Sequence, residues 1–262
     1  MKIGFFDSGL GGLSILKAVA KEMPNYDYVF YGDTANLPYG NKTVEIIYKY
    51  TSQGMKYLFE AGCNIVIIAC NTASVETARR LQDEFLPSKY PDCKILGIIV
   101  PTIEFLTFNV PTKVLMIGTK RTVESGKFQL ELDRKGNGNT LLTQISTPEL
   151  VPLIEMNELE AAAKQAIFRI ESEMEDNKVV VLGCTHYTQI KNQLRNHFGG
   201  SKIIISQDEV IPEKLRSYLG YHPEIECNLS RDGERSVHLT KHCPAYDLFM
   251  GRQLGGVYID QD

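Results

Sequence analysis

The sequence lacks the features that would place the protein in a membrane, on nucleic acid or in the secretory pathway. No apolar run approaches the roughly 18 residues of a membrane-spanning helix, and Ile3–Phe6 is too short for the core of a signal peptide. The chain has no strong basic cluster and a net charge of −4, so neither nucleic acid nor an anionic membrane is expected as a partner. A cytoplasmic protein is the default expectation.

Paired cysteine motifs are also missing. The six cysteines form no C-x-x-C pair and no Cys/His spacing of a zinc site: Cys63, Cys70, Cys93, Cys184, Cys227 and Cys243. In a reducing compartment they are expected to be free thiols. The sequence therefore predicts no bound metal.

A nucleotide-binding signature is absent from the glycine-rich turn at residues 7–12. Gly9-x-Gly11 begins like a dinucleotide loop, but Ser14 stands where the third glycine belongs, and no Gly-Lys-Ser/Thr marks a phosphate-binding loop. A tight turn from strand to helix explains the glycines. It does not explain Asp7, a carboxylate at the end of the first expected strand.

What is present indicates a globular fold with a large core. The 262 residues suit one large domain or two small ones, and 43% are hydrophobic with no low-complexity tract. The apolar patterns predict strands at 2–6, 28–31, 65–69, 95–99, 113–117, 141–145, 179–183, 202–205, 224–229 and 236–239. They predict helices at about 13–23, 43–60, 74–85, 122–133, 158–175, 210–218 and 245–254, and a turn at 136–139.

Two cysteines stand at equivalent places in this pattern. Cys70 follows one apolar run and Cys184 follows another, and each is followed by polar residues and an expected helix. A single cysteine after a strand is usually a small core hydrophobe. Two at the carboxyl ends of parallel strands favour a ligand site, because ligands bind at that edge of open α/β sheets. A helix N-terminus behind each thiol is expected to lower its pKa and make it reactive.

The strand-end sites recur at nearly one spacing. Asp7 and Cys70 are 63 residues apart, and Thr119 and Cys184 are 65 apart, which suggests two similar halves. The predicted fold is α/β, with two similar parallel-sheet domains that face each other across a cleft in pseudo-symmetry. The first domain is expected at 1–98 plus 209–262 and the second at 99–208, with two chain crossings as a hinge and the site in the cleft.

Five motifs then carry a resemblance to a known family. They are Phe6-Asp7-Ser8-Gly9 with Gly11-Gly12-Leu13, Tyr31-Gly32-Asp33, Pro38-Tyr39-Gly40, Ala69-Cys70-Asn71-Thr72-Ala73-Ser74 and Gly183-Cys184-Thr185-His186-Tyr187. Together with Gly118-Thr119, Thr122, Ser125, Pro152 and Glu155, they resemble the motifs of glutamate racemases, in the aspartate/glutamate racemase superfamily. The match runs in order from residue 1 to about residue 190. It departs at Thr188-Gln189-Ile190, where the family usually has a proline and two leucines.

The resemblance implies a cofactor-independent racemase that supplies D-glutamate for peptidoglycan synthesis and uses neither metal nor pyridoxal phosphate. It implies that Cys70 and Cys184 are the acid/base groups, with Asp7 assisting Cys70, and His186 with Glu155 assisting Cys184. The implied substrate-binding residues are Asp7, Ser8, Tyr39, Gly40, Asn71, Thr72, Thr185 and His186, with Asp33 and Thr119 as further candidates. Asp33 and Glu155 have structural roles as alternatives, and His186 has an alternative as a helix cap.

Two thiols also suit this chemistry for a reason that does not depend on the resemblance. A racemase removes the Cα proton from one face of an amino acid and returns a proton to the other, so it needs acid/base groups on opposite sides. One thiolate can act as the base and one neutral thiol as the acid.

Two alternative functions stay open at this point. An aspartate racemase of the same superfamily is one, although the resemblance implies an acidic residue after Cys-Thr in such relatives, where this chain has His186. A non-catalytic two-domain ligand-binding protein is the other, because hinged α/β chains suit solute capture. The oligomeric state is open, with a homodimer as one alternative.

Overall fold

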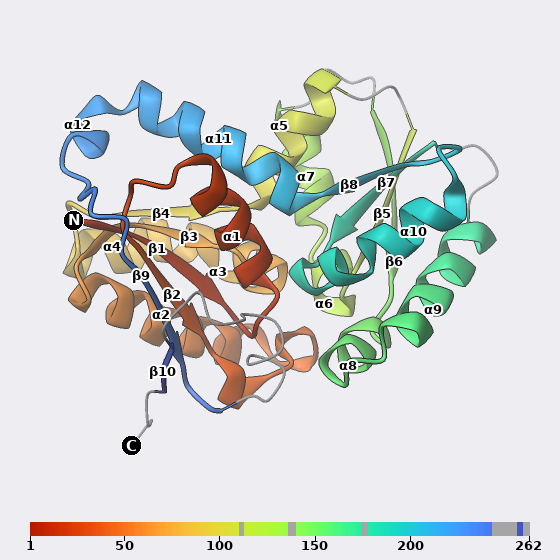
Figure 1. Ribbon diagram of the computed structural model, residues 1–262, viewed down its shortest axis with the longest axis horizontal. Coiled ribbons are helices and arrows are strands. Elements are labelled where there is room, and N and C mark those ends of the chain that lie inside the picture. Colours follow the sequence, from red (N-terminus) through yellow and green to blue (C-terminus); the bar gives the residue numbers. More distant parts are fainter. Residues whose placement is uncertain (110–112, 136–139, 174–177, 243–255, 259–262) are drawn as a thin grey trace.

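Two parallel β-sheets organise the chain, one in each half of the molecule (Figure 1). The computed structural model describes residues 1–109, 113–135, 140–173, 178–242 and 256–258. The first sheet has the order β10-β9-β2-β1-β3-β4: Gly256–Tyr258, Arg235–Leu239, Tyr28–Gly32, Lys2–Asp7, Cys63–Ile68 and Lys94–Gly97. The second has the order β6-β5-β7-β8: Leu141–Ser146, Lys113–Gly118, Val179–Gly183 and Ile203–Ser206. All of these described strand pairs are parallel, which confirms the predicted fold class.

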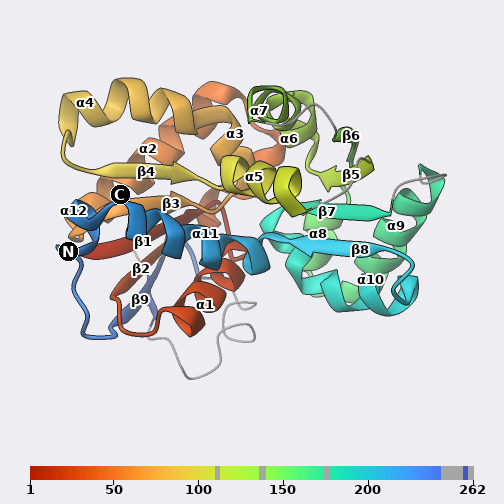
Figure 2. The ribbon, with the colours of Figure 1, turned by 90° about the horizontal axis from the view of Figure 1, so that it is seen from above.

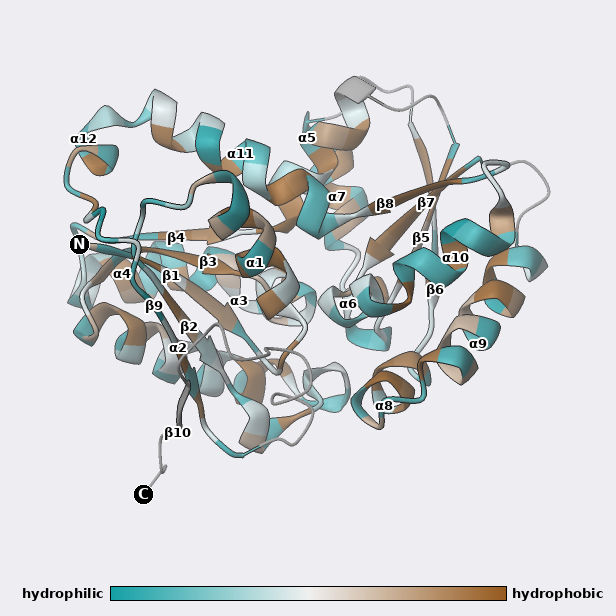
Figure 3. Cartoon of the chain, viewed as in Figure 1, coloured by the Kyte–Doolittle hydropathy of each residue, from teal (hydrophilic) through white to brown (hydrophobic). Residues whose placement is uncertain are grey.

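Helices cover both faces of the sheets, because the central strands are apolar on both sides. In the first half they are α1 to α4: Gly12–Glu22, Val44–Glu60, Asn71–Arg80 and Leu86–Lys89, with a π-helical turn Leu81–Phe85 between the last two. In the second half they are α6 to α10: Lys120–Glu124, Lys127–Lys135, Leu150–Glu155, Leu159–Ser172 and Lys191–Phe198. Figure 3 shows the hydrophobic colour along β7 and β8 and on the inner sides of the helices.

The chain crosses between the halves twice. It passes from β4 into α5, Ile99–Asn109, and returns from β8 into α11, Gln207–Tyr221. Figure 2 shows α5 and α11 side by side at this junction, and α11 also packs on α1. One apolar cluster continues from the first sheet to the second through residues of both helices, including Ile103 and Leu215. The expected return of the tail is confirmed where β9 pairs with β2.

Several expected elements differ in the structure. The strand predicted at 224–229 is wrong: a short helix, α12, occupies Pro223–Glu226, with the proline in its first turn, where its missing N–H costs nothing. The helix α5 was not predicted, because Pro101 suggests a break, yet Pro101 lies in the first turn of that helix. The helix predicted at 122–133 is interrupted by Gly126, whose φ is +64°. The turn expected at 136–139, the helix expected at 245–254 and the free thiol expected at Cys243 lie outside the described residues.

Candidate active site

A small cavity lies between the carboxyl ends of the two sheets, with a volume of about 40 Å³. Residues from both halves line it: Ser8, Leu37, Pro38, Tyr39, Gly40, Asn41, Cys70, Asn71, Thr72, Thr119, Lys120, Pro148, Val151, Pro152, Cys184, Thr185 and His186. Most of the residues that the sequence singles out therefore line this cavity. Asp7, Asp33 and Glu155 do not line it, and they act on residues that do.

Cys70 lines the cavity from the first half of the molecule. It follows β3 and caps α3: its Sγ accepts a hydrogen bond from the Ala73 N–H at 3.4 Å and lies 3.3 Å from Ser8 Oγ. Burial, with a smaller contribution from the nearby Asp7 charge, raises the pKa of the Cys70 thiol to about 12. The expectation of a lowered pKa is therefore wrong for Cys70, because desolvation outweighs the helix N-terminus. Cys70 is held as a neutral thiol.

Asp7 joins the two halves behind the cavity. Its Oδ1 accepts from the Gly9 N–H at 2.8 Å, and its Oδ2 accepts from the Thr185 hydroxyl at 3.1 Å. Burial raises the pKa of Asp7, and the His186 charge lowers it by less. Gly11 explains the glycine-rich turn: a Cβ there would lie 2.4 Å from Thr185 Oγ1. The glycines let the first half approach the second.

Cys184 has its own acid/base partner. It follows β7 and is buried, and its Sγ lies 3.8 Å from His186 Nδ1, while His186 Nε2 bonds Glu155 Oε1. Burial lowers the pKa of His186, but the hydrogen bonds to Cys184 and Glu155 raise it more, so that it lies well above the usual value. The helix expected after Cys184 begins as a 3-10 helix, Thr185–Ile190, and continues as α10. The His186 ring therefore bridges Cys184 and Glu155, and within the part of the chain that the structure describes it makes no helix-capping hydrogen bond.

A buried amide pair, which sequence reasoning missed, lies beside Cys70. Asn71 Nδ2 donates to Gln207 Oε1 at 2.6 Å, and Gln207 Nε2 donates to Asn71 Oδ1 at 2.9 Å and to Thr102 Oγ1 at 3.1 Å. Gln207 and Thr102 belong to the two crossing helices, α11 and α5. The available signal was the position of Gln207 directly after β8, at the same sheet edge as the cysteines. The pair connects the crossings to the cavity.

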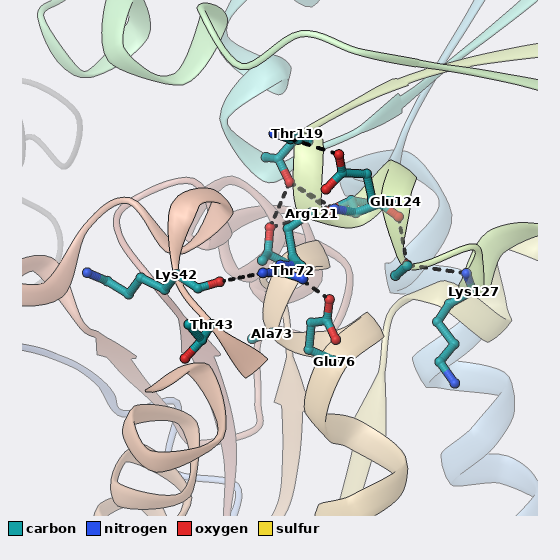
Figure 4. A network of polar contacts seen from close by, with 12 residues as sticks. Lys42, Thr43, Thr72, Ala73, Glu76, Thr119, Arg121, Glu124 and Lys127 are labelled. Atoms are coloured by element: carbon teal, nitrogen blue, oxygen red, sulfur yellow. Dashed lines mark hydrogen bonds and ion pairs between the residues drawn. The ribbon is translucent and has the colours of Figure 1, made fainter. Parts of the chain in front are cut away.

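Hydroxyl groups near the other strand ends form the remaining polar contacts of the site. Thr72 Oγ1 lies 3.0 Å from Thr119 Oγ1 and 3.3 Å from Thr122 Oγ1, which links α3 to α6 (Figure 4). Asp33 accepts the Tyr39 hydroxyl at 2.6 Å and the Thr240 hydroxyl at 3.0 Å. Because Asp33 lies outside the cavity, the structure favours its structural alternative, that of holding Tyr39 in place.

The described residues hold no group of three or more His, Cys, Asp or Glu that could bind a metal ion. Among the same residues, no helix is long and apolar enough to cross a bilayer.

The fold and site define a class: α/β proteins in which each of two parallel-sheet halves contributes one cysteine to a shared cavity. The model of the Asp/Glu/hydantoin racemase family matches residues 14–211. The chain is 35% identical over 239 residues to the glutamate racemase of Dinoroseobacter shibae, an alignment that covers 86% of each protein. The chain therefore belongs to the Asp/Glu/hydantoin racemase family, and it is an isomerase of the racemase type.

Solved structures agree with this assignment. The glutamate racemase of Francisella tularensis, determined in complex with D-glutamate, superposes with a TM-score of 0.83 at 26% identity, covering 99% of this chain and 97% of that one. The RacE1 isoform from Bacillus anthracis gives a TM-score of 0.86 at 23% identity with the same coverage, which supports the fold.

Proposed function

We propose that this protein interconverts L-glutamate and D-glutamate without a cofactor, with Cys70 and Cys184 as the two acid/base groups. The observation that carries the proposal is that two buried thiols, one from each half, line a single cavity. The curated relatives at about 35% identity are glutamate racemases, which supports glutamate as the substrate.

The different surroundings of the two thiols support different roles. A raised pKa favours the imidazolium form of His186, which stabilises a thiolate on Cys184. Cys70, with a pKa of about 12, favours the neutral thiol. In the L-to-D direction the Cys184 thiolate takes the Cα proton, and the Cys70 thiol gives its proton to the opposite face. The site then holds a Cys184 thiol and a Cys70 thiolate, ready for the reverse direction.

Acid/base groups alone contribute about 10²–10⁴-fold to rate, too little for so weak a carbon acid. The remainder is expected from hydrogen bonds to the carboxylate that gains charge as the proton leaves. The hydroxyls of Ser8 and Thr72 and the amide of Asn71 line the cavity, which supports that role for them. Lys120 is the only Lys or Arg among the described lining residues and suits one substrate carboxylate.

The cavity must open for the substrate to enter. A volume of about 40 Å³ holds a few water molecules, whereas glutamate has ten heavy atoms. We therefore propose that the halves separate on each turnover, with α5 and α11 as the hinge. We further propose that the D-glutamate formed supplies peptidoglycan synthesis in the cytoplasm; a homodimer stays a prediction.

Circular dichroism of L-glutamate, incubated with purified protein dialysed against a chelator, tests this function. The signal should decay to zero as the racemic mixture forms, and adding metal should change nothing. L-Aspartate, measured in parallel, should give a much lower kcat/KM, because a misplaced side-chain carboxylate leaves polar groups unpaired. Equal turnover of both acids would identify the aspartate-type alternative. Tight binding of glutamate with no decay would identify a ligand-binding protein.

A further inference from the structure

Arg121 makes polar contacts from the second half to two segments of the first half (Figure 4). It lies in α6, the helix capped by Thr119, and its Nη2 donates to the Lys42 carbonyl at 3.0 Å. Its Nε lies 3.6 Å from Glu76 Oε1. One guanidinium thus bridges the domain interface at the rim of the cavity.

Both partners belong to segments that form the site. Lys42 ends the 3-10 turn Tyr39–Asn41, whose three residues all line the cavity, and the Lys42 N–H donates to the Tyr39 carbonyl at 3.0 Å. Glu76 lies in α3, whose N-terminus is capped by Cys70. Arg121 therefore ties the turn over the cavity and the helix beneath it to the opposite half.

The burial of Glu76 distinguishes this contact from an ordinary surface pair. The Glu76 side chain is 11% exposed and that of Arg121 is 31% exposed, whereas Lys120 and Glu124 in the same helix are 60% and 55% exposed. A carboxylate buried to this degree needs a charged or hydrogen-bonded partner. Separation of the halves would remove that partner and expose Glu76 to water.

The turn and α6 also fit closely where Arg121 holds them. A Cβ on Gly40 would lie 3.2 Å from Thr119 Cβ, so glycine permits the turn to pack against the start of α6. With the turn in this position the cavity has a volume of only about 40 Å³. Separation of the halves would break this packing and the Arg121 contacts together.

We propose that Arg121 is a latch: a positioning residue that holds the Tyr39–Asn41 turn closed over the substrate and releases it when the halves separate. The role in turnover rests on the proposed function; the holding of the turn does not. Such a latch stabilises the ground state and the transition state of the bound complex equally, so its loss raises KM and leaves kcat nearly unchanged.

The test compares Arg121→Gln with Arg134→Gln, a matched control whose ion pair to Glu131 lies within the single helix α7. Hydrogen exchange of the backbone amides at 39–42 should accelerate about three- to tenfold in Arg121→Gln, with exchange in β7 unchanged. KM should rise by about the same factor with kcat within about twofold. Arg134→Gln should match the wild type in all three measurements.

Arg121→Lys serves as the second variant, because it keeps the charge and loses the fork that reaches both partners. It should accelerate exchange at 39–42 by less than the glutamine does. Unchanged exchange in both Arg121 variants would overturn the latch, and so would a fall in kcat at constant KM. Failure of the wild type to racemise glutamate would refute the proposed function alone, since the exchange measurement does not depend on activity.

Discussion

The Thr185 hydroxyl donates to Asp7 Oδ2 at 3.1 Å and joins the turn after β7 to the end of β1. Thr185 directly follows Cys184, and the Asp7 charge acts on Cys70. The surroundings of the two thiols are therefore linked through one buried hydrogen bond between the halves. A change at Asp7 is expected to affect stability and activity in opposite directions.

Asp7→Asn should stabilise the protein and inactivate it. Burial raises the pKa of Asp7, so the folded state favours the neutral acid. The stability that this preference contributes is fully present below the pKa of the unfolded state, and it is lost as the pH rises through the pKa of the folded state. At neutral pH the ionised group therefore costs stability. The asparagine keeps the shape and removes the charge, so urea unfolding should show a gain of about 0.5–2 kcal/mol. Racemisation should fall by about 10²-fold or more.

Asp33→Asn is the contrasting control. Its carboxylate accepts hydroxyl hydrogen bonds from Tyr39 and Thr240, so the same replacement should destabilise by about 1–3 kcal/mol. A less stable Asp7→Asn protein would contradict the sign derived for Asp7.

Glu155→Gln should shift the pH dependence of kcat/KM. The hydrogen bond and charge of Glu155 help to hold the pKa of His186 above its usual value, and the proposed mechanism uses protonated His186. Removing the charge lowers that pKa, so activity should be lost at a lower pH on the alkaline side of the profile. The matched control is Glu171→Gln, which alters the surface pair with His197 and should leave the profile unchanged. An unshifted profile in Glu155→Gln would assign Glu155 a structural role.

Cys70→Ala and Cys184→Ala should each abolish net racemisation. Each variant keeps one thiol, which in heavy water can remove and return a proton on its own face. Cys70→Ala should therefore exchange deuterium into L-glutamate, and Cys184→Ala into D-glutamate, each without inversion, as proton NMR can follow. Exchange into the opposite enantiomers would reverse the assignment of faces, and full racemisation by either variant would rule out the two-thiol mechanism.

Gln207→Leu should destabilise the protein by about 1–3 kcal/mol, because it leaves the buried Asn71 amide without its partner. Asn71→Leu should cost a similar amount. The double variant should be less destabilised than the sum of the two, since replacing both partners by apolar groups removes the unpaired amide. Chemical unfolding of the four proteins measures this coupling. Strictly additive losses would show that the pair contributes no interaction energy.

Much of the fold could be predicted from the sequence because its signals are local. Apolar runs such as Val179–Gly183 define buried parallel strands, and the polar residues after them mark the ligand-binding edge of the sheet. The sequence-based prediction missed the helices at Pro101 and at 224–229. Each of these helices has a proline in its first turn, where proline does not interrupt the helix.

By itself, the sequence determined two parallel sheets and the residues at their carboxyl ends, because strand patterns and strand-end residues are adjacent in the chain. Only the tertiary structure decided what surrounds each group. The pKa of Cys70 rises because both halves exclude water from it, and no spacing of residues encodes that desolvation. The contacts of Gln207 with Asn71 and of Arg121 with Glu76 likewise join distant segments, and only the packing of the two halves brings them together.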